Sequence, residues 1–130
     1  MMNDEYSKIQ SFTDLDAWKE GHKLVLMVYK QTKNFPSKEK FSLIDQMRRA
    51  VISVTSNVAE GFSRWSYAEK IRFYYIAQGS TTELQNQLIV SRDIGYLGQE
   101  DFEQLSQQSV IVHKLINGII KGAKRTLHNS

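Results

Sequence analysis

The chain has 130 residues, of which 41% are hydrophobic and 24% charged, and a net charge of +3; this fits one mildly basic globular domain over residues 1–130 and excludes a disordered chain. It contains no cysteine, which excludes disulfide bonds, thiolate metal sites and a cysteine nucleophile. The longest apolar run, 24–29, is far shorter than the ~20 residues that cross a bilayer, and no secretory signal opens the sequence, so we expect a cytoplasmic protein with no membrane partner.

The first predicted helix spans about residues 14–33. Its apolar side chains recur at spacings of three and four residues, which is the period of one helix face: Leu15, Trp18, His22, Val25 and Tyr29, with Leu24 and Val28 widening that face. Thr13 followed by Asp16 has the spacing of a capping box at the start, and Pro36 disfavours helix at the residue before it. Because His22 lies on the apolar face, the pattern favours a hydrogen-bonded core histidine over a metal ligand.

The second predicted helix runs from about 38 to 60. Ser37 is its candidate N-cap, and Gly61 stands where helices commonly end in the left-handed conformation. The same spacing of three and four residues identifies its core face: Ile44, Met47, Val51, Val54 and Val58.

The third and fourth predicted helices span about 67–93 and 100–122. Ser66 and Glu69 form a capping-box pair before the third helix, and the glycines of 95–98 end it. The fourth helix begins with acidic residues and ends with lysines, which complements the helix dipole.

Four helices of similar length with short connections predict an all-α protein. Short connections make successive helices antiparallel neighbours, so we expect an up-down-up-down four-helix bundle. The flanking segments 1–12 and 123–130 are expected to be loose.

A line of polar residues runs along the second predicted helix beside its apolar face. We call it the polar line: Gln46, Arg49, Ser53, Asn57 and Glu60, with Arg64 one turn beyond. It has three interpretations. It can be a polar seam within the bundle or between subunits. It can contact RNA or DNA, together with Arg48 and Arg64. It can also bind a ligand or catalyse a reaction through Arg49, Asn57 and Glu60.

The sequence predicts no catalytic residue, metal or cofactor. General acid–base catalysis usually needs a second titratable group within reach, and the polar line offers Glu60 neither a histidine nor another carboxylate. His22, His113 and His128 lack the spacing of helical metal ligands. Gly79 lies in a helical segment without the other residues of a phosphate-binding loop, and we expect it to allow a close contact between helices.

Aromatic and basic residues alternate after the second predicted helix. Three consecutive aromatic residues, 73–75, cannot all face one core, so at least one must meet another surface. With Arg64, Lys70 and Arg72 among them, this stretch can form a subunit interface or stack nucleic-acid bases. Likewise, the acid-free basic segment 114–130 can be a solvated helix end or a nucleic-acid contact.

The motifs between about residues 12 and 97 resemble a family of bacterial four-helix bundle proteins. This family includes the proteins encoded in 23S rRNA intervening sequences and the accessory variability proteins of diversity-generating retroelements. The most specific matches are Asn57-x-Ala59-Glu60-Gly61 and Gly79-Ser80-x-x-Glu83-Leu84. The chain departs from the family pattern at Gln78, where the family usually has arginine, and at Thr55, where it usually has proline. The lost arginine weakens nucleic-acid binding at that face, and the retroelement proteins are more basic than +3, so we place the chain nearer the intervening-sequence branch.

The resemblance implies a ring of five four-helix bundles without enzymatic activity. In the retroelement branch it implies binding of nucleic acid and a reverse transcriptase. Five copies of a +3 chain carry about +15, and multivalent contact strengthens a weak basic patch. We therefore expect a homopentamer that contacts RNA or DNA through these residues: Arg48, Arg49, Arg64, Lys70, Arg72, Lys121, Lys124 and Arg125. The alternative is a scaffold that binds a protein such as a reverse transcriptase without touching nucleic acid.

Overall fold

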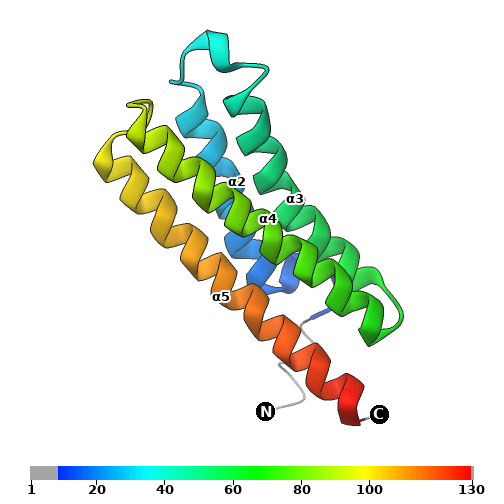
Figure 1. Ribbon diagram of the computed structural model, residues 1–130. Coiled ribbons are helices and arrows are strands. Elements are labelled where there is room, and N and C mark those ends of the chain that lie inside the picture. Colours follow the sequence, from blue (N-terminus) through cyan, green and yellow to red (C-terminus); the bar gives the residue numbers. More distant parts are fainter. Residues whose placement is uncertain (1–8, 130) are drawn as a thin grey trace.

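The computed structural model describes residues 9–129, which fold into four long helices and two short 3-10 turns (Figure 1). In chain order these elements are η1 (Phe12–Asp14), α2 (Asp16–Thr32), η2 (Ser37–Glu39), α3 (Leu43–Ser63), α4 (Tyr67–Asp93) and α5 (Gln99–Asn129). Each long helix packs against two others, because α2 and α4 both lie between α3 and α5. The predicted antiparallel four-helix bundle is confirmed.

The core lies along the axis between the four helices. On α3 the predicted apolar face is confirmed, since all five of its members are buried. On α2 the prediction is confirmed in part, since Leu24, Val25 and Val28 are buried. The buried face lies to the Leu24 and Val28 side of the predicted one, and its other predicted members are half-buried or exposed. It includes Gly21, where an added Cβ would lie 3.0 Å from the Thr55 methyl group, so a small residue lets α2 approach α3 closely.

The prediction of a core histidine at His22 is wrong. The rotation of the α2 face leaves His22 exposed, with its ring stacked on the half-buried Trp18 at a centroid distance of 4.8 Å. Phe12 packs edge-on against the same indole. The aromatic side chains of α2 therefore form an outer layer over its small, close-packed residues.

Two predicted N-caps are corrected by the 3-10 turns. The side chain of Ser11, not Thr13, caps the turn before α2, and Asp14 completes the capping box. Ser37 opens η2 instead of capping a helix, so α3 begins five residues later than predicted, at Leu43. Pro36 precedes this turn and sets the extended conformation from which it starts.

Three glycine predictions have different outcomes. Gly95 has a φ of +87° and ends α4, which confirms the predicted break. Helix α3 passes through Gly61 and ends at Ser63, so the predicted end at Gly61 is wrong. Gly79 is exposed, and an added Cβ would meet nothing within 4 Å, so the predicted close contact does not occur within the chain.

Helix α5 is longer than the sequence predicts. It continues past 122 to Asn129, and Ala123 is buried, so residues 123–129 are helical where a loose segment was expected. Figure 1 shows this end of α5, drawn in red, extending beyond the neighbouring helices. Of the other segment predicted to be loose, 1–12, residues 1–8 lie outside the described part of the chain. We call residues 121–129 the α5 end.

Candidate nucleic-acid interface

The middle of the polar line lies at the contact between α3 and α4. The hydroxyls of Ser53 and Ser80 are 2.8 Å apart and form a hydrogen bond between the two helices. The Asn57 amide donates to the Ser53 carbonyl at 2.8 Å and to its hydroxyl at 3.0 Å. These half-buried groups satisfy one another, which agrees with the interpretation as a polar seam.

The two ends of the polar line lie on the surface. Gln46 is exposed, and Arg49, with 79% of its side chain exposed, pairs with Asp45 on its own helix at 2.9 Å. At the other end, Glu60 accepts a hydrogen bond from Ser63 and lies 3.5 Å from the Arg64 guanidinium. The structure therefore does not bring Arg49 and Glu60 to one site. Between residues 9 and 129 there is no cluster of three His, Asp or Glu side chains able to hold a metal ion.

Arg48 is occupied at the C-terminal end of α2. Its Nε donates to the Thr32 hydroxyl at 3.0 Å and its Nη2 donates to the Tyr29 carbonyl at 3.4 Å. Its guanidinium also lies over the Tyr29 ring, 4.4 Å from the centroid. The last carbonyls of a helix lack intrahelical partners and carry partial negative charge, so a cation is stabilising there.

Lys70, in the first turn of α4, contacts the C-terminal end of α3 as Arg48 contacts that of α2. Its ammonium donates to the Phe62 carbonyl at 2.7 Å and, more weakly, to the Gly61 carbonyl at 3.5 Å. Partial burial lowers the pKa of this ammonium. Lys70 is therefore a structural cation that joins the start of α4 to the end of α3.

Arg64 and Arg72 lie over the same aromatic ring. The guanidinium carbons are 4.6 and 5.2 Å from the centroid of Phe73. Arg64 also pairs with Glu60 and, at 4.0 Å, with Glu69, whereas Arg72 is exposed. Of these two predicted contacts, Arg72 is the more accessible to a phosphate.

The α5 end brings the remaining predicted cations together. Lys121, Lys124 and Arg125 are exposed, and none forms an ion pair with any residue in the described part of the chain. Together with His128 and Asn129 they line a surface hollow of about 410 Å³. No acidic residue occurs in 104–129, so the carboxylates of α5 are confined to its first turns, far along the helix from these cations.

Two members of this surface were missed by the sequence analysis. His128 was assigned to a loose tail, although its spacing from Lys121, Lys124 and Arg125 is helical. Tyr75 on α4 was grouped with its aromatic neighbours, but 44% of the residue is exposed and its ring centroid lies 5.0 Å from the Lys124 ammonium. Only the packing of α5 against α4 brings these residues together.

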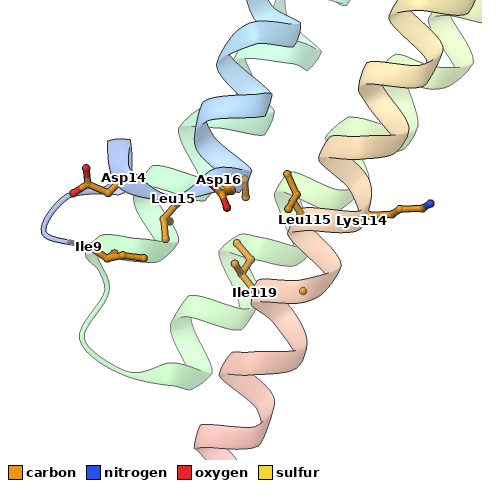
Figure 2. A pocket seen from close by; sticks show the side chains of 9 residues that line it. Ile9, Asp14, Leu15, Asp16, Lys114, Leu115 and Ile119 are labelled. Carbon is orange, nitrogen blue, oxygen red and sulfur yellow. The ribbon is translucent and has the colours of Figure 1, made fainter. Parts of the chain in front are cut away.

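A second hollow, of about 320 Å³, lies between the start of α2 and the middle of α5. Figure 2 shows Leu15, Leu115 and Ile119 around it, while the Lys114 ammonium points away. Asp14 accepts hydrogen bonds from the backbone of Gln10 and Ser11, which lower the pKa of its carboxyl. Lys114 is thus turned outward and Asp14 is occupied, which leaves Asp16 as the remaining charged group in a lining that is mainly apolar.

The antiparallel helices with their polar seam define a small helical-bundle protein. The family model described as 23S rRNA-intervening sequence protein matches residues 13–118. The chain belongs to this family, as the motifs indicated. No helix between residues 9 and 129 is long and apolar enough to span a bilayer.

Solved structures share this fold. One of them is the crystal structure of a protein of unknown function from the S23 ribosomal protein family of Bacteroides thetaiotaomicron, with 23% sequence identity and a TM-score of 0.75. The match covers 81% of this chain and 95% of the other. Among curated proteins, none matches the chain.

Proposed function

We propose that this protein is a non-enzymatic homo-oligomer that binds RNA or DNA through the α5 end. The observation that supports the proposal is the difference in occupancy among the predicted cations. Arg48 and Lys70 are held by helix carbonyls, whereas Lys121, Lys124 and Arg125 have no ion-pair partner among residues 9–129. Phosphate binding draws on exposed cations whose counterions it can release.

Self-association is part of this proposal because one copy offers few charges. Ile76, Val90 and Ile94 lie along one side of α4, and between 39% and 50% of each residue is exposed. Exposed Gly79 is on the same helix and adds no side chain that would hold a second copy away. Five copies, as the family resemblance implies, would repeat each α5 end around a ring and bind a polyanion multivalently.

A protein scaffold is the second candidate function. Its supporting observation is the exposure of two large aromatic residues in helix junctions, Phe41 at 88% and Trp65 at 97%. Aromatic residues are enriched in protein interfaces. A partner such as a reverse transcriptase would cover these side chains without any nucleic-acid contact.

Salt-dependent binding distinguishes the two candidates. Labelled structured RNA and duplex DNA are titrated at about 50 and 200 mM salt, with the mass of the protein measured in the same samples. The variant Lys121→Ala/Lys124→Ala/Arg125→Ala should bind more weakly. Its negative slope of log affinity against log salt should become shallower by about 2 to 3. The matched control is Lys23→Ala/Lys30→Ala/Lys33→Ala, which removes the same charge from exposed positions on or just after α2.

The control decides whether position or total charge matters. If both triple variants lose the same affinity, binding is a non-specific effect of net charge and the assignment to the α5 end is wrong. If the intact oligomer binds no nucleic acid at low salt, the proposal is wrong and the scaffold function is favoured. A monomeric mass at working concentration contradicts self-association.

A further inference from the structure

We infer that the α5 end receives a single nucleic-acid strand, with one base stacked on Tyr75 and the adjoining phosphates on Lys121, Lys124 and Arg125. This inference rests on the proposed function and specifies the form of nucleic acid that the surface fits. It joins two observations: a row of cations without ion-pair partners among residues 9–129, and an exposed aromatic ring held beside them.

Tyr75 is the outward-facing member of the three consecutive aromatic residues. Tyr74 is buried in the core, and Phe73 is covered by the guanidinium groups of Arg64 and Arg72. Tyr75 keeps 44% of its surface exposed, and its only described ring contact is the ammonium of Lys124. A ring in this position can offer a face to a base.

The position of Tyr75 relative to the α5 end is fixed by packing between α4 and α5. Gln78, almost one turn further along α4, donates a hydrogen bond from its amide to Asn117 on α5. Lys124 lies two turns beyond Asn117 towards the C-terminus, and its ammonium is 5.0 Å from the centroid of the Tyr75 ring. The aromatic ring and the cations therefore belong to one rigid surface.

Basic and polar side chains of the α5 end follow the direction in which a strand would run. Lys121, Arg125 and His128 lie about one helical turn apart, or ~5.4 Å along the axis. With Lys124 they surround the hollow of about 410 Å³. Because a lysine side chain is flexible, the Lys124 ammonium can turn from the ring to a phosphate while a base takes its place on the ring.

This chemistry favours a single strand over a duplex. A duplex hides its base faces in the stack, so an exposed ring beside the cations adds nothing to its binding. A single strand can use both the cations and the ring, and stacking is independent of sequence. Two more exposed aromatic residues, Trp65 and Tyr67, belong to the α3–α4 junction, which lies at the same end of the bundle as the α5 end (Figure 1).

The test compares single strands and duplexes of the same sequence, as RNA and as DNA, by fluorescence anisotropy. Tyr75→Leu should weaken binding of the single strands about tenfold or more without changing the salt slope, because it removes stacking and no charge. Tyr75→Phe, which keeps the ring, should bind as the unchanged protein does. Phe41→Leu, at an exposed aromatic position in the α2–α3 junction at the opposite end of the bundle, should also have no effect (Figure 1).

The outcomes separate this inference from the proposed function. If Tyr75→Leu binds normally while the triple cation variant does not, stacking is wrong and the basic surface stands. Equal or tighter binding of duplexes also overturns the inference. Binding to phosphatidylglycerol vesicles without binding to strands would replace it with a membrane contact. If no nucleic acid binds at all, the inference fails together with the proposed function. Thermal unfolding shows whether each variant is folded.

Discussion

The helix junctions and the α5 end contain the same kinds of residue and use them in opposite ways. At the junctions, Arg48 and Lys70 donate to the last carbonyls of α2 and α3. Gly61 lies beneath the buried ring of Tyr74. At the α5 end the arginine and lysines are exposed, Gly122 has open space around it, and Tyr75 faces outward.

This difference shows that a basic and aromatic sequence pattern does not by itself identify a binding surface. The C-terminal end of a helix leaves carbonyl groups without partners, and a nearby cation gains from binding them. Arg48 of α3 and Lys70 of α4 lie near such ends and donate hydrogen bonds to their carbonyls. The cations of the α5 end are exposed and have no ion-pair partner within the described residues, which leaves them available to another molecule.

The largest expected difference in folding stability is between alanine variants of two glycines, Gly61 and Gly122. Gly61→Ala should destabilise the fold by about 2 kcal/mol, as in other overpacked cores. Its Cβ would lie 2.6 Å from the Tyr74 ring and 3.2 Å from the Lys70 carbonyl, and backbone cannot move aside easily. The measurement is urea unfolding followed by circular dichroism.

Gly122→Ala is the matched control. An added Cβ there meets nothing within 4 Å, so the better helix propensity of alanine should stabilise the protein by about 0.5 to 1 kcal/mol. A Gly61→Ala protein as stable as the unchanged one would contradict the close packing at the α3–α4 junction.

Much of the fold could be predicted from the sequence because helical spacing is a local property. It predicted the order of the four helices, the Ser66 cap and the break at Gly95, all of which the structure confirms. It placed only part of the α2 face correctly, because it also counted large aromatic residues such as Trp18 as core. The small residues of α2 make the closest contacts instead, as Gly21 does with Thr55.

The candidate site was less predictable because its contacts join distant parts of the chain. The sequence showed that Arg48 and Lys124 are cations, but not what each contacts. Arg48 reaches back to the end of the preceding helix, and Lys124 meets Tyr75 on α4. The end of α5 was also missed, although buried Ala123 continues the apolar spacing of that helix.

Replacing Arg48 and replacing Arg125 should have different effects on the free energy of unfolding, with a smaller difference than between the two glycine variants. Arg48→Ala removes hydrogen bonds from a charged donor and a cation–π contact, and should cost about 1 to 2 kcal/mol of stability. Arg125→Ala should change stability by less than about 0.5 kcal/mol because it is an exposed position without an ion-pair partner in the described chain.

Binding measurements complete the arginine comparison. We expect the reverse order there, with Arg125→Ala weakening nucleic-acid binding and Arg48→Ala leaving it close to unchanged at temperatures where the variant is folded. An Arg48→Ala protein of normal stability that binds poorly would show that Arg48 leaves the α2 carbonyls to bind phosphate.

The smallest expected effect on the free energy of unfolding is at alkaline pH, where Tyr74 and Tyr75 should differ. Burial raises the pKa of Tyr74 from 10.0 to about 12, with the nearby Tyr67 adding to the shift. Folding therefore holds the Tyr74 proton more tightly than the unfolded chain does. The resulting stability is complete below pH 10 and is lost as the pH rises towards 12, because ionisation then favours the unfolded chain. At pH 11 this loss amounts to about 1 kcal/mol.

Tyr74→Phe should remove this part of the alkaline fall in the free energy of unfolding. The hydrogen bond to Glu39 raises the pKa of Tyr96 and so acts in the same direction, which means that a smaller fall should persist in the variant. Tyr75→Phe should keep the full fall, since Tyr75 is exposed and this variant still contains Tyr74. The measurement is urea unfolding at pH 8, 10 and 11, with tyrosinate absorbance followed in the folded protein. Equal curves for the two variants would mean that the Tyr74 hydroxyl is open to water, and that the α3–α4 junction is as accessible as the α5 end.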